Sequence, residues 1–310
     1  MKVTVVGAGN VGATCAQRII ESDIADVYLV DVVEGLAAGK ALDLAEAAPL
    51  AGHSRRISGG TDYDPAEGSD VVVITAGVAR KPGMSRDDLL QINGKIVTSI
   101  TEEVTHVAPG AIIIMVTNPL DVTVHIAKQV SGLPRERVIG MAGALDTARL
   151  RCFVAEELDC AGVDVQAMVL GGHGDSMVPL PRQATVGGVP LTELIEPARL
   201  EEIIQRTRDG GAEIVGLLKT GSAFYAPAAG VKEMVAAIVQ DERRLLPVSV
   251  LLQGEYGIED TFVGVPVKLG AGGVAEIVEV DLNAEELAAL QTSAAHVRET
   301  VEKWEDLKNN

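Results

Sequence analysis

The sequence is poor in aromatic residues and cysteines, and it contains no long apolar run. Aromatic side chains make up 3% of the 310 residues, and the three cysteines are Cys15, Cys152 and Cys160. Their odd number and irregular spacing argue against a disulfide framework, and without a CxxC pair they predict no metal site. Because no stretch of about 18 consecutive apolar residues occurs, we expect no membrane-spanning helix. These absences favour reduced thiols in a cytoplasmic protein.

Basic residues are also scarce, with 26 lysines and arginines against 44 acidic residues and a formal net charge of -18. Such a surface repels nucleic acid and anionic membranes, so neither is expected as a partner. The apolar run at residues 3–7 follows a single lysine and leads directly into glycines, so no export signal is expected. Apolar residues nevertheless make up 47% of the chain, which is long enough for two closely joined domains.

Short apolar runs alternate with longer helical patterns in the first half of the chain. Strands are expected at residues 2–7, 27–31, 71–75, 111–117 and 138–140, with a further strand near residues 55–58. Helices are expected at residues 10–22, 34–47, 87–107 and 121–130. Strands separated by helices pair in parallel through right-handed crossovers. Residues 1–143 are therefore predicted to form an α/β domain with a Rossmann-type doubly wound parallel sheet.

The pattern changes after residue 143. Helices are expected at residues 145–158, 200–219, 231–240 and 284–307. Strands are expected at residues 165–170, 245–252, 262–269 and 274–280, with a hairpin around a Gly-Gly turn at residues 184–190. Antiparallel strands with long helices predict a C-terminal α+β domain over residues 144–310. No flexible linker separates the two halves.

A glycine-rich turn follows the first predicted strand and opens the first predicted helix. It reads Gly7-Ala8-Gly9-Asn10-Val11-Gly12. The first glycine permits the tight turn, the second lets the backbone approach a pyrophosphate, and the third lets the helix pack close to the sheet. Asp31 ends the second strand 19 residues after Gly12, where a carboxylate accepts both ribose hydroxyls of NAD and repels the extra phosphate of NADP. The alternative is a plain glycine turn beside a surface acid.

Two arginines, Arg80 and Arg86, lie in a polar loop that follows the strand at residues 71–75. Ligands bind beyond the carboxyl ends of the strands in a parallel sheet. A guanidinium group is a planar fork that matches a carboxylate and stays charged when buried. In so acidic a chain, two arginines at this place indicate a small substrate with more than one negative charge.

His173 differs from the other four histidines because it lies among glycines at the end of a predicted strand, in Gly171-Gly172-His173-Gly174. Small neighbours leave room for a ligand to reach the ring. An imidazole with a near-neutral pKa can accept a proton from an alcohol as hydride leaves the same carbon. The alternative is a histidine with a structural role in a glycine turn.

Asp146 and Arg149 lie at positions i and i+3 of a helical segment whose other residues are small or apolar, so both point from one face. A buried carboxylate there can orient His173, and Arg149 can bind a substrate carboxylate as a fork. A solvated ion pair is the alternative. Asn118 ends another strand just before a proline, where its amide can bind a substrate oxygen or the cofactor ribose, and a simple Asn-Pro turn is the alternative.

Five segments, taken together, resemble the malate/lactate dehydrogenase family over essentially the whole chain. They are GAGNVG, ITAGVARKPGMSRDDLL, VTNPLD, LDTARLR and GGHGDSMVP. The resemblance implies an NAD-dependent oxidoreductase in which His173 is the acid/base and Asp146 is its carboxylate partner. It also implies that Arg86 polarises the substrate carbonyl, that Arg149 binds the adjacent carboxylate and that Asn118 orients the substrate. Residues 77–88 resemble the mobile lid of the family.

The same resemblance assigns the far end of the substrate to Arg80, where lactate dehydrogenases typically carry glutamine. An arginine suits a second carboxylate, so we expect reversible oxidation of (S)-malate to oxaloacetate. The alternative is a lactate dehydrogenase that acts on a monocarboxylic 2-hydroxy acid. The implied cofactor-binding residues are Gly7, Ala8, Gly9, Asn10, Val11, Gly12, Asp31, Asn93, Val116, Thr117 and Asn118.

Two other classes of protein share a dinucleotide turn. An NAD-dependent glycoside hydrolase needs metal-ligating cysteine and histidine, and no suitable pair is evident. An NAD-sensing module has no reason to keep Asp146, Arg149 and His173 together. Because NAD carries the electrons, the expected reaction needs no metal. Family members are usually dimers or tetramers, so a homotetramer serving the tricarboxylic acid cycle is expected, with a dimer as the alternative.

Overall fold

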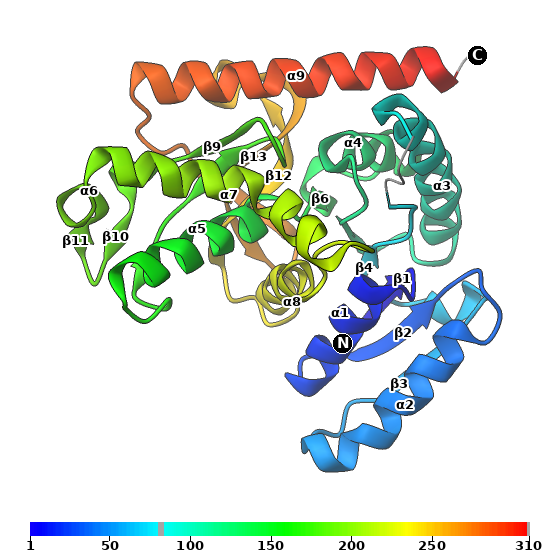
Figure 1. Cartoon of the computed structure of the whole chain (residues 1–310). Helices are drawn as coiled ribbons and strands as arrows, with labels where there is room; N and C mark the ends of the chain where they lie inside the picture. The colour runs from blue at the N-terminus through cyan, green and yellow to red at the C-terminus, as the bar shows by residue number, and fades with distance from the viewer. Residues whose placement is uncertain (80–83, 309–310) are drawn as a thin grey trace.

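The computed structural model describes residues 1–79 and 84–308, and its first half is built on a parallel sheet (Figure 1). Six strands lie in the order β3-β2-β1-β4-β5-β6, which is the usual order of a doubly wound dinucleotide-binding sheet. All neighbouring pairs among them are parallel, as expected. The strands are β1 (Lys2–Val6), β2 (Asp26–Val30), β3 (Ile57–Gly60), β4 (Val71–Ile74), β5 (Ile112–Met115) and β6 (Val138–Gly140).

Helices cover both faces of this sheet, and for that reason its central strands are apolar throughout. Val71 and Val73 of β4 pack into one hydrophobic core, whereas Val72 and Ile74 pack into another. Successive side chains of a strand point to opposite faces, so a single strand supplies both layers. The helices of the first half are α1 (Asn10–Glu21), α2 (Leu36–Ala51), α3 (Arg86–Val107), α4 (Leu120–Ser131) and the short 3-10 helices η1 (Asp64–Ala66) and η2 (Arg135–Arg137).

The second half continues the same sheet. Its strand β12 lies antiparallel beside β6 through one residue pair, Ser249 with Gly140, and β13, β8 and β9 follow in order, while β14 pairs with β13. A separate small sheet has the order β11-β10-β7. The strands are β7 (Val165–Gln166), β8 (Val169–Gly171), β9 (Met177–Pro179), β10 (Thr185–Val186), β11 (Val189–Pro190), β12 (Arg244–Gln253), β13 (Glu259–Gly270) and β14 (Gly273–Ile277). The helices are α5 (Gly143–Leu158), η3 (Pro181–Gln183), α6 (Leu191–Leu194), α7 (Pro197–Leu218), α8 (Tyr225–Val239), η4 (Glu255–Gly257) and α9 (Ala284–Lys308).

The single strand expected at residues 165–170 is wrong. The chain pairs with β10 at residues 165–166 and then leaves that small sheet, so that residues 169–171 pair with β9 and β13 in the large one. The hairpin at residues 184–190 is confirmed, and both glycines of its turn have positive φ angles of 57° and 88°. Helix α8 begins at Tyr225, six residues earlier than expected, and Pro227 is tolerated in its first turn because the first amides of a helix have no acceptor within it.

The C-terminal helix α9 extends from the second half over the outer layer of the first half, where it packs on α3 and α4 (Figure 1). Near its end Trp304 is only 4% exposed and belongs to the hydrophobic core that contains Val72 and Ile74. The Trp304 ring occupies the space above Gly94 of α3, where an added Cβ would lie 2.2 Å from the ring. The last helix of the chain therefore completes the packing around the parallel sheet.

Cys15, Cys152 and Cys160 are all free thiols, and burial raises the pKa of Cys15 to about 12. Among the helices of residues 1–79 and 84–308, none combines the length and the apolar character needed to cross a bilayer.

Candidate active site

The turn after β1 has the geometry that its three glycines predict. Gly7 has a φ angle of +102°, and an added Cβ would lie 2.7 Å from the backbone nitrogen of Ala76. A Cβ at Gly12 would lie 1.8 Å from the carbonyl oxygen of Gly7, so only glycine lets α1 start so close to the strand. By contrast, nothing lies within 4 Å of a Cβ at Gly9. The turn therefore opens outward at Gly9, at the N-terminus of α1, where helix amides attract a phosphate.

Asp31 lies against this turn. Its Oδ2 accepts a hydrogen bond from the Ala8 amide at 2.7 Å, and its Oδ1 accepts one from the Val33 amide at 3.0 Å. The Nζ of Lys40 in α2 donates to the carbonyl oxygen of Ala8 at 2.7 Å. Sequence reasoning missed Lys40, because a lysine within a helix gives no sign that it reaches back to the turn. Asp31 and Lys40 therefore both hold the turn at Ala8, Asp31 through the backbone amide and Lys40 through the carbonyl oxygen.

The ends of β4 and β5 are joined by Asn93 of α3, whose side chain is 1% exposed. Its Oδ1 accepts from the Val78 amide at 2.8 Å, and its Nδ2 donates to the carbonyl oxygen of Asn118 at 2.7 Å. The hydroxyl of Thr117 donates to the carbonyl oxygen of Ala76 at 2.7 Å. Asn118 itself is exposed and precedes a cis proline. These bonds hold Asn118 at the carboxyl edge of the sheet, as the sequence predicts.

His173, Asp146 and Arg149 come together around one carboxylate. The Nδ1 of His173 lies 3.0 Å from Oδ2 of Asp146, and Nη1 of Arg149 lies 3.2 Å from Oδ1 of the same residue. The Asp146 side chain is 2% exposed, against 17% for His173 and 12% for Arg149. The i,i+3 spacing on α5 therefore does form the predicted one-sided pair, and the pair is buried.

The surroundings of His173 shift its pKa upward. Burial alone would lower the pKa of the imidazole, but the charge and the hydrogen bond of Asp146 outweigh burial and raise the pKa above its ordinary value. The charge of Asp121 acts in the same direction, and that of Arg149 opposes it. The protonated imidazole of His173 therefore keeps its proton to a higher pH than a free imidazole does.

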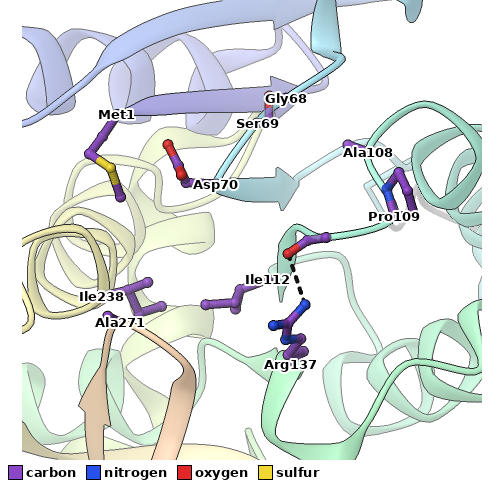
Figure 2. Close-up of a pocket in the computed structure, with 11 residues that line it drawn as sticks. Met1, Gly68, Ser69, Asp70, Ala108, Pro109, Ile112, Arg137, Ile238 and Ala271 are labelled. Carbon is purple, nitrogen blue, oxygen red and sulfur yellow. Dashed lines mark hydrogen bonds between the residues drawn. The ribbon is translucent and has the colours of Figure 1, made fainter.

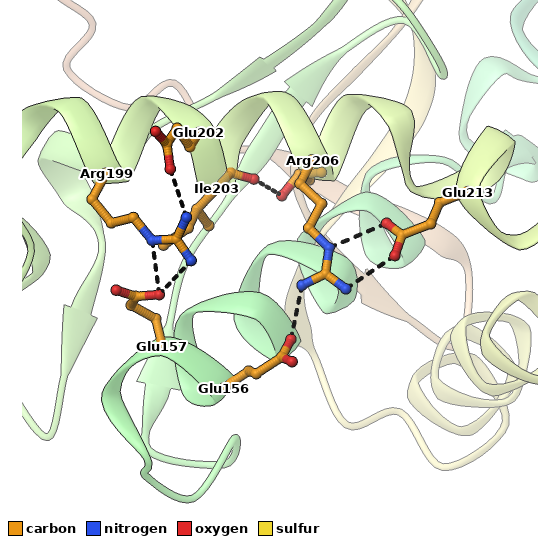
Figure 3. Close-up of polar contacts among 8 residues, drawn as sticks. Glu156, Glu157, Arg199, Glu202, Ile203, Arg206 and Glu213 are labelled. Carbon is orange, nitrogen blue, oxygen red and sulfur yellow. Dashed lines mark hydrogen bonds and ion pairs between the residues drawn. The ribbon is translucent and has the colours of Figure 1, made fainter.

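Helix α7 is held to α5, the helix that carries Arg149, by ion pairs (Figure 3). The guanidinium of Arg206 binds Glu156 of α5 at 2.9 Å and Glu213 of its own helix at 3.0 Å, and it lies 4.1 Å from the centre of the Phe153 ring. One turn further along α7, an added Cβ at Gly210 would lie 3.1 Å from Cδ of Arg149. The Nε of Arg149 is buried and has no hydrogen-bond partner among the described residues. The glycine therefore gives the arginine side chain its space.

A second pair of ion-pair contacts continues this fastening. Arg199 of α7 binds Glu157 of α5 at 2.7 Å and Glu202 at 2.6 Å (Figure 3). All of these side chains are partly exposed, so each pair alone contributes little to stability. Their shared effect is to set the spacing of α5 and α7 beside Arg149.

Arg86 is the first residue of α3, and its Nη2 lies 3.1 Å from Oδ2 of Asp175, two residues beyond His173. Both side chains are largely exposed. Ser85 and Asp88 form a capping box that starts the helix at this place. Arg86 and His173 also border a common cavity of about 620 Å³, together with Asn118. Arg80, which was predicted for the same loop, lies outside the described residues.

Sequence reasoning missed the polar residues that hold the His173 loop. Asp121 is 6% exposed and binds both Ser249 of β12 and the backbone amide of His173. Asp121 is part of the VTNPLD segment, but an acid in the first turn of a helix is commonly a partner of the helix dipole. Nothing in the sequence links it to a serine 128 residues further along.

A second cavity, of about 320 Å³, lies at the opposite, amino-terminal edge of the sheet (Figure 2). Asp70 and Arg137 are its charged side chains, and both already have backbone partners, the Lys2 amide at 2.7 Å and the Gly110 carbonyl oxygen at 3.1 Å. Since both charged side chains of this cavity are already hydrogen-bonded to the backbone, they offer a ligand less than the groups around His173 do. Within the described ranges, no cluster of three or more histidine, cysteine or acidic side chains could hold a metal ion.

The residues at the carboxyl edge fit NAD. The open side of Gly9, the amides at the start of α1 and the carboxylate of Asp31 provide for a pyrophosphate and a ribose without an added phosphate. A turn of this kind near a histidine–carboxylate pair is typical of an NAD-dependent oxidoreductase. The chain belongs to the lactate/malate dehydrogenase family. The NAD binding domain of that family matches residues 1–140, and its alpha/beta C-terminal domain matches residues 143–308.

Known relatives cover the whole chain. The malate dehydrogenase of Thermomicrobium roseum is 58% identical over 306 residues, which are 99% of each chain. The solved malate dehydrogenase from Salinibacter ruber has 52% identity and a TM-score of 0.96, and the match covers 100% of this chain and 99% of that one. The lactate dehydrogenase from Cryptosporidium parvum, solved with lactic acid and nicotinamide adenine dinucleotide, has 38% identity and a TM-score of 0.94 over 98% of each chain. Since both kinds of enzyme share the fold, the substrate depends on particular side chains.

Proposed function

We propose that this protein is a malate dehydrogenase that reversibly oxidises (S)-malate to oxaloacetate with NAD. The observation that carries the proposal is the buried carboxylate of Asp146, which holds His173 on one oxygen and Arg149 on the other. One residue thereby aligns a proton acceptor with a carboxylate-binding group. That is the pair of functions that a 2-hydroxy acid requires.

The cofactor is assigned to the carboxyl edge of the parallel strands. When bound, NAD would accept the hydride from the substrate carbon, so the reaction needs no metal. Asp31 would bind the ribose hydroxyls, and the amides of the turn would bind the pyrophosphate. Asn93 contributes by holding the backbone that borders the cofactor. The residues proposed for the cofactor site are Gly7, Ala8, Gly9, Asn10, Val11, Gly12, Asp31, Asn93, Val116, Thr117 and Asn118.

His173 is proposed to move the proton. During malate oxidation its Nε2 takes the proton of the hydroxyl group, and Asp146 stabilises the imidazolium that forms. During oxaloacetate reduction the same nitrogen returns the proton to the developing alkoxide. The raised pKa of His173 keeps this proton available to a higher pH than a free imidazole would.

The anionic groups of the substrate are assigned to arginines. Arg149 would bind the carboxylate beside the reacting carbon as a fork, because the shared carboxylate of Asp146 holds its guanidinium beside His173. Arg86 would stabilise the charge that develops on the carbonyl oxygen, and Asn118 would orient the substrate. Arg80 would bind the second carboxylate. The lid predicted at residues 77–88 includes residues 80–83, which lie outside the described residues. Exclusion of water from the site would strengthen these contacts.

We assign to Arg80 the choice between oxaloacetate and pyruvate as the acid that is reduced, and therefore between malate and lactate as the product. A charge-assisted hydrogen bond contributes about 1.5–3 kcal/mol, and an arginine left unpaired in a closed site costs more. At about 3 kcal/mol, oxaloacetate should be preferred over pyruvate by roughly 100-fold. The test is steady-state kinetics with NADH and either acid. Equal kcat/KM for the two acids would overturn the assignment in favour of a broad 2-hydroxy acid dehydrogenase.

A homotetramer in the cytoplasm, with a place in the tricarboxylic acid cycle, completes the proposal. The assembly of several chains is supported by a set of exposed apolar side chains on α2 and around the α7–α8 connection, among them Leu50 at 92% and Leu217 at 75% exposure. We assign cofactor binding to residues 1–143 and substrate binding with catalysis to residues 144–310. Sedimentation velocity tests the assembly, and a species of one-chain mass would contradict it.

A further inference from the structure

Asp121 is a buried carboxylate that the proposed mechanism does not use. It lies in the first turn of α4, three residues after Asn118, and is 6% exposed. Its Oδ1 accepts from the hydroxyl of Ser249 at 2.7 Å, and its Oδ2 accepts from the backbone amide of His173 at 2.9 Å. Burial raises the pKa of Asp121 above its ordinary value and the charge of Asp146 acts in the same direction, whereas both of these donors favour the charged form.

The loop that carries His173 is held at the neighbouring peptide as well. The amide of Gly172 donates to the hydroxyl of Ser293 in α9 at 2.8 Å. A Cβ at Gly172 would lie 2.9 Å from the hydroxyl of Ser176 and 3.3 Å from Oδ2 of Asp121, so the loop is packed closely here. Two consecutive amides therefore have buried side-chain acceptors from α4 and α9.

The Asp121 contacts lie where the two halves of the sheet meet. Ser249 forms with Gly140 the one residue pair that joins β12 to β6. Asp121 follows the segment that ends β5 and presents Asn118. A single side chain thus connects the cofactor half, the junction of the sheet and the backbone of His173.

We propose that Asp121, bonded to Ser249, is a positioning residue that sets the backbone of His173 against Asn118 and adds a second buried negative charge behind the imidazole. This inference deepens the proposed function and rests on it for the role of His173. The side-chain bond of Asp146 orients the ring, whereas Asp121 fixes the main chain that carries it. Two contacts on different atoms restrict His173 more than either alone.

The effect of Asp121 on His173 adds to that of the other charged groups around the imidazole. Asp146 and Asp121 are buried carboxylates, and Arg149, whose side chain is 12% exposed, is the cation bonded to Asp146. Their effects are weakly screened, whereas water and salt screen the exposed charges. The exposed titratable groups around the adjoining cavity, on α3, α9 and the His173 loop, are Arg86, Asp87, Asp175, His296, Glu299 and Lys303.

Three substitutions separate charge from position. Asp121→Asn keeps the shape and can keep both bonds, because its oxygen accepts from His173 and its NH₂ group donates to the Ser249 hydroxyl. Asp121→Ala removes the charge and both bonds. Ser69→Ala is the control, because Ser69 is a buried hydroxyl bonded to Thr4 at 2.8 Å at the other end of the sheet.

The readouts are the pH profile of kcat/KM for oxaloacetate and an NMR titration of the His173 ring, assigned with His173→Asn. We expect Asp121→Asn to keep the low-pH plateau and to lose about 3-fold at high pH, which corresponds to a half-unit fall in the pKa of His173. Asp121→Ala should lower the plateau roughly 10- to 100-fold while the dissociation constant of NADH stays unchanged. Ser69→Ala should change neither profile.

Two results would overturn the inference. One is that both Asp121 variants show the same ring titration and pH profile as the wild-type protein. The other is an equal loss in Asp121→Ala and Ser69→Ala, which would mean that only stability was affected. If the wild-type protein fails to reduce oxaloacetate, the proposed function fails, but the ring titration still tests the contact between Asp121 and His173.

Discussion

Arg149 and His173 bind opposite oxygens of the same carboxylate, Asp146, at 3.2 Å and 3.0 Å. Under the proposed mechanism, the group that binds the substrate and the group that transfers its proton are therefore aligned by one side chain. Because Asp146 is almost fully buried, neither contact competes with water. A change at Asp146 should affect proton transfer and substrate binding together.

Replacing Asp146 with asparagine tests the electrostatic part of this arrangement. Reduction of oxaloacetate requires protonated His173, so kcat/KM is constant below the pKa of His173 and falls as the pH rises through it. Asp146 raises that pKa, so Asp146→Asn should start the fall at a lower pH and reduce kcat near pH 7 by about 100-fold. Steady-state rates between about pH 5 and 9 measure both effects.

An unchanged pH profile in Asp146→Asn would show that another group transfers the proton. The affinity for NADH serves as the internal control, since Asp146 lies on α5 and makes no contact with the glycine turn in the described structure. A loss of NADH binding of the same size would point to misfolding instead.

The glycines of the turn should differ sharply in what their replacement does. Gly9→Ala places its Cβ in open space on a backbone with ordinary angles, so the melting temperature should stay unchanged while NADH binding weakens by roughly 10-fold or more. Gly12→Ala would force its Cβ onto the Gly7 carbonyl oxygen and should reduce both stability and binding. Thermal unfolding and NADH fluorescence titration separate the two cases.

Gly39→Ala is the matched control for this pair, because Gly39 lies in α2 and its added Cβ meets nothing within 4 Å. It should bind NADH normally. If Gly9→Ala also binds NADH with wild-type affinity, the phosphates do not approach the turn at Gly9 and the cofactor assignment must be revised.

Gly210 should control the substrate affinity without contacting the substrate. Its replacement by alanine would bring a Cβ to 3.1 Å from Cδ of Arg149 and force that side chain to move. The expected result is a KM for oxaloacetate that rises about 10-fold, the equivalent of about 1.4 kcal/mol. The melting temperature should not fall, because alanine favours a helix over glycine.

Gly216→Ala on the same helix provides the comparison, since no atom lies within 4 Å of its added Cβ. It should leave both KM and kcat unchanged. Equal KM values for the two variants would show that Arg149 tolerates the methyl group, or that its exact position does not limit binding.

Arg80→Gln should shift the substrate preference toward pyruvate. The argument comes from sequence alone, because residue 80 lies outside the described residues. Loss of the second carboxylate contact should reduce kcat/KM for oxaloacetate by roughly 100-fold. The ratio of kcat/KM for the two acids is the measurement, and a variant that keeps full oxaloacetate selectivity would assign the distal carboxylate to another residue.

The fold of the first half could be predicted because local patterns determine it. Apolar runs such as Val71–Ile74, separated by helical patterns, leave parallel pairing as the favoured arrangement. The different roles of Gly7, Gly9 and Gly12 also followed from their spacing, and the space around each agrees with them. In both cases the patterns that predict the structure lie close together in the sequence, although the contacts themselves, such as that of Gly7 with Ala76, do not.

Pairings between distant segments could not be predicted in the same way. Residues 165–170 have one continuous strand pattern, yet their two ends pair in different sheets, since partner strands determine where a strand stops. Asp121 and Ser249 are 128 residues apart, and neither position has a motif that identifies the other. The pair of Asp146 and Arg149 could be predicted because both residues lie on a single turn of α5.

The position of Trp304 over Gly94 makes the packing of the cofactor-binding half depend on a residue of the second half. Every strand of the parallel sheet precedes α9 in the sequence, so the sheet can be fully paired while its outer layer is still incomplete. A fragment that ends before α9 would therefore contain every strand of that sheet and still expose the apolar surface that Trp304 covers.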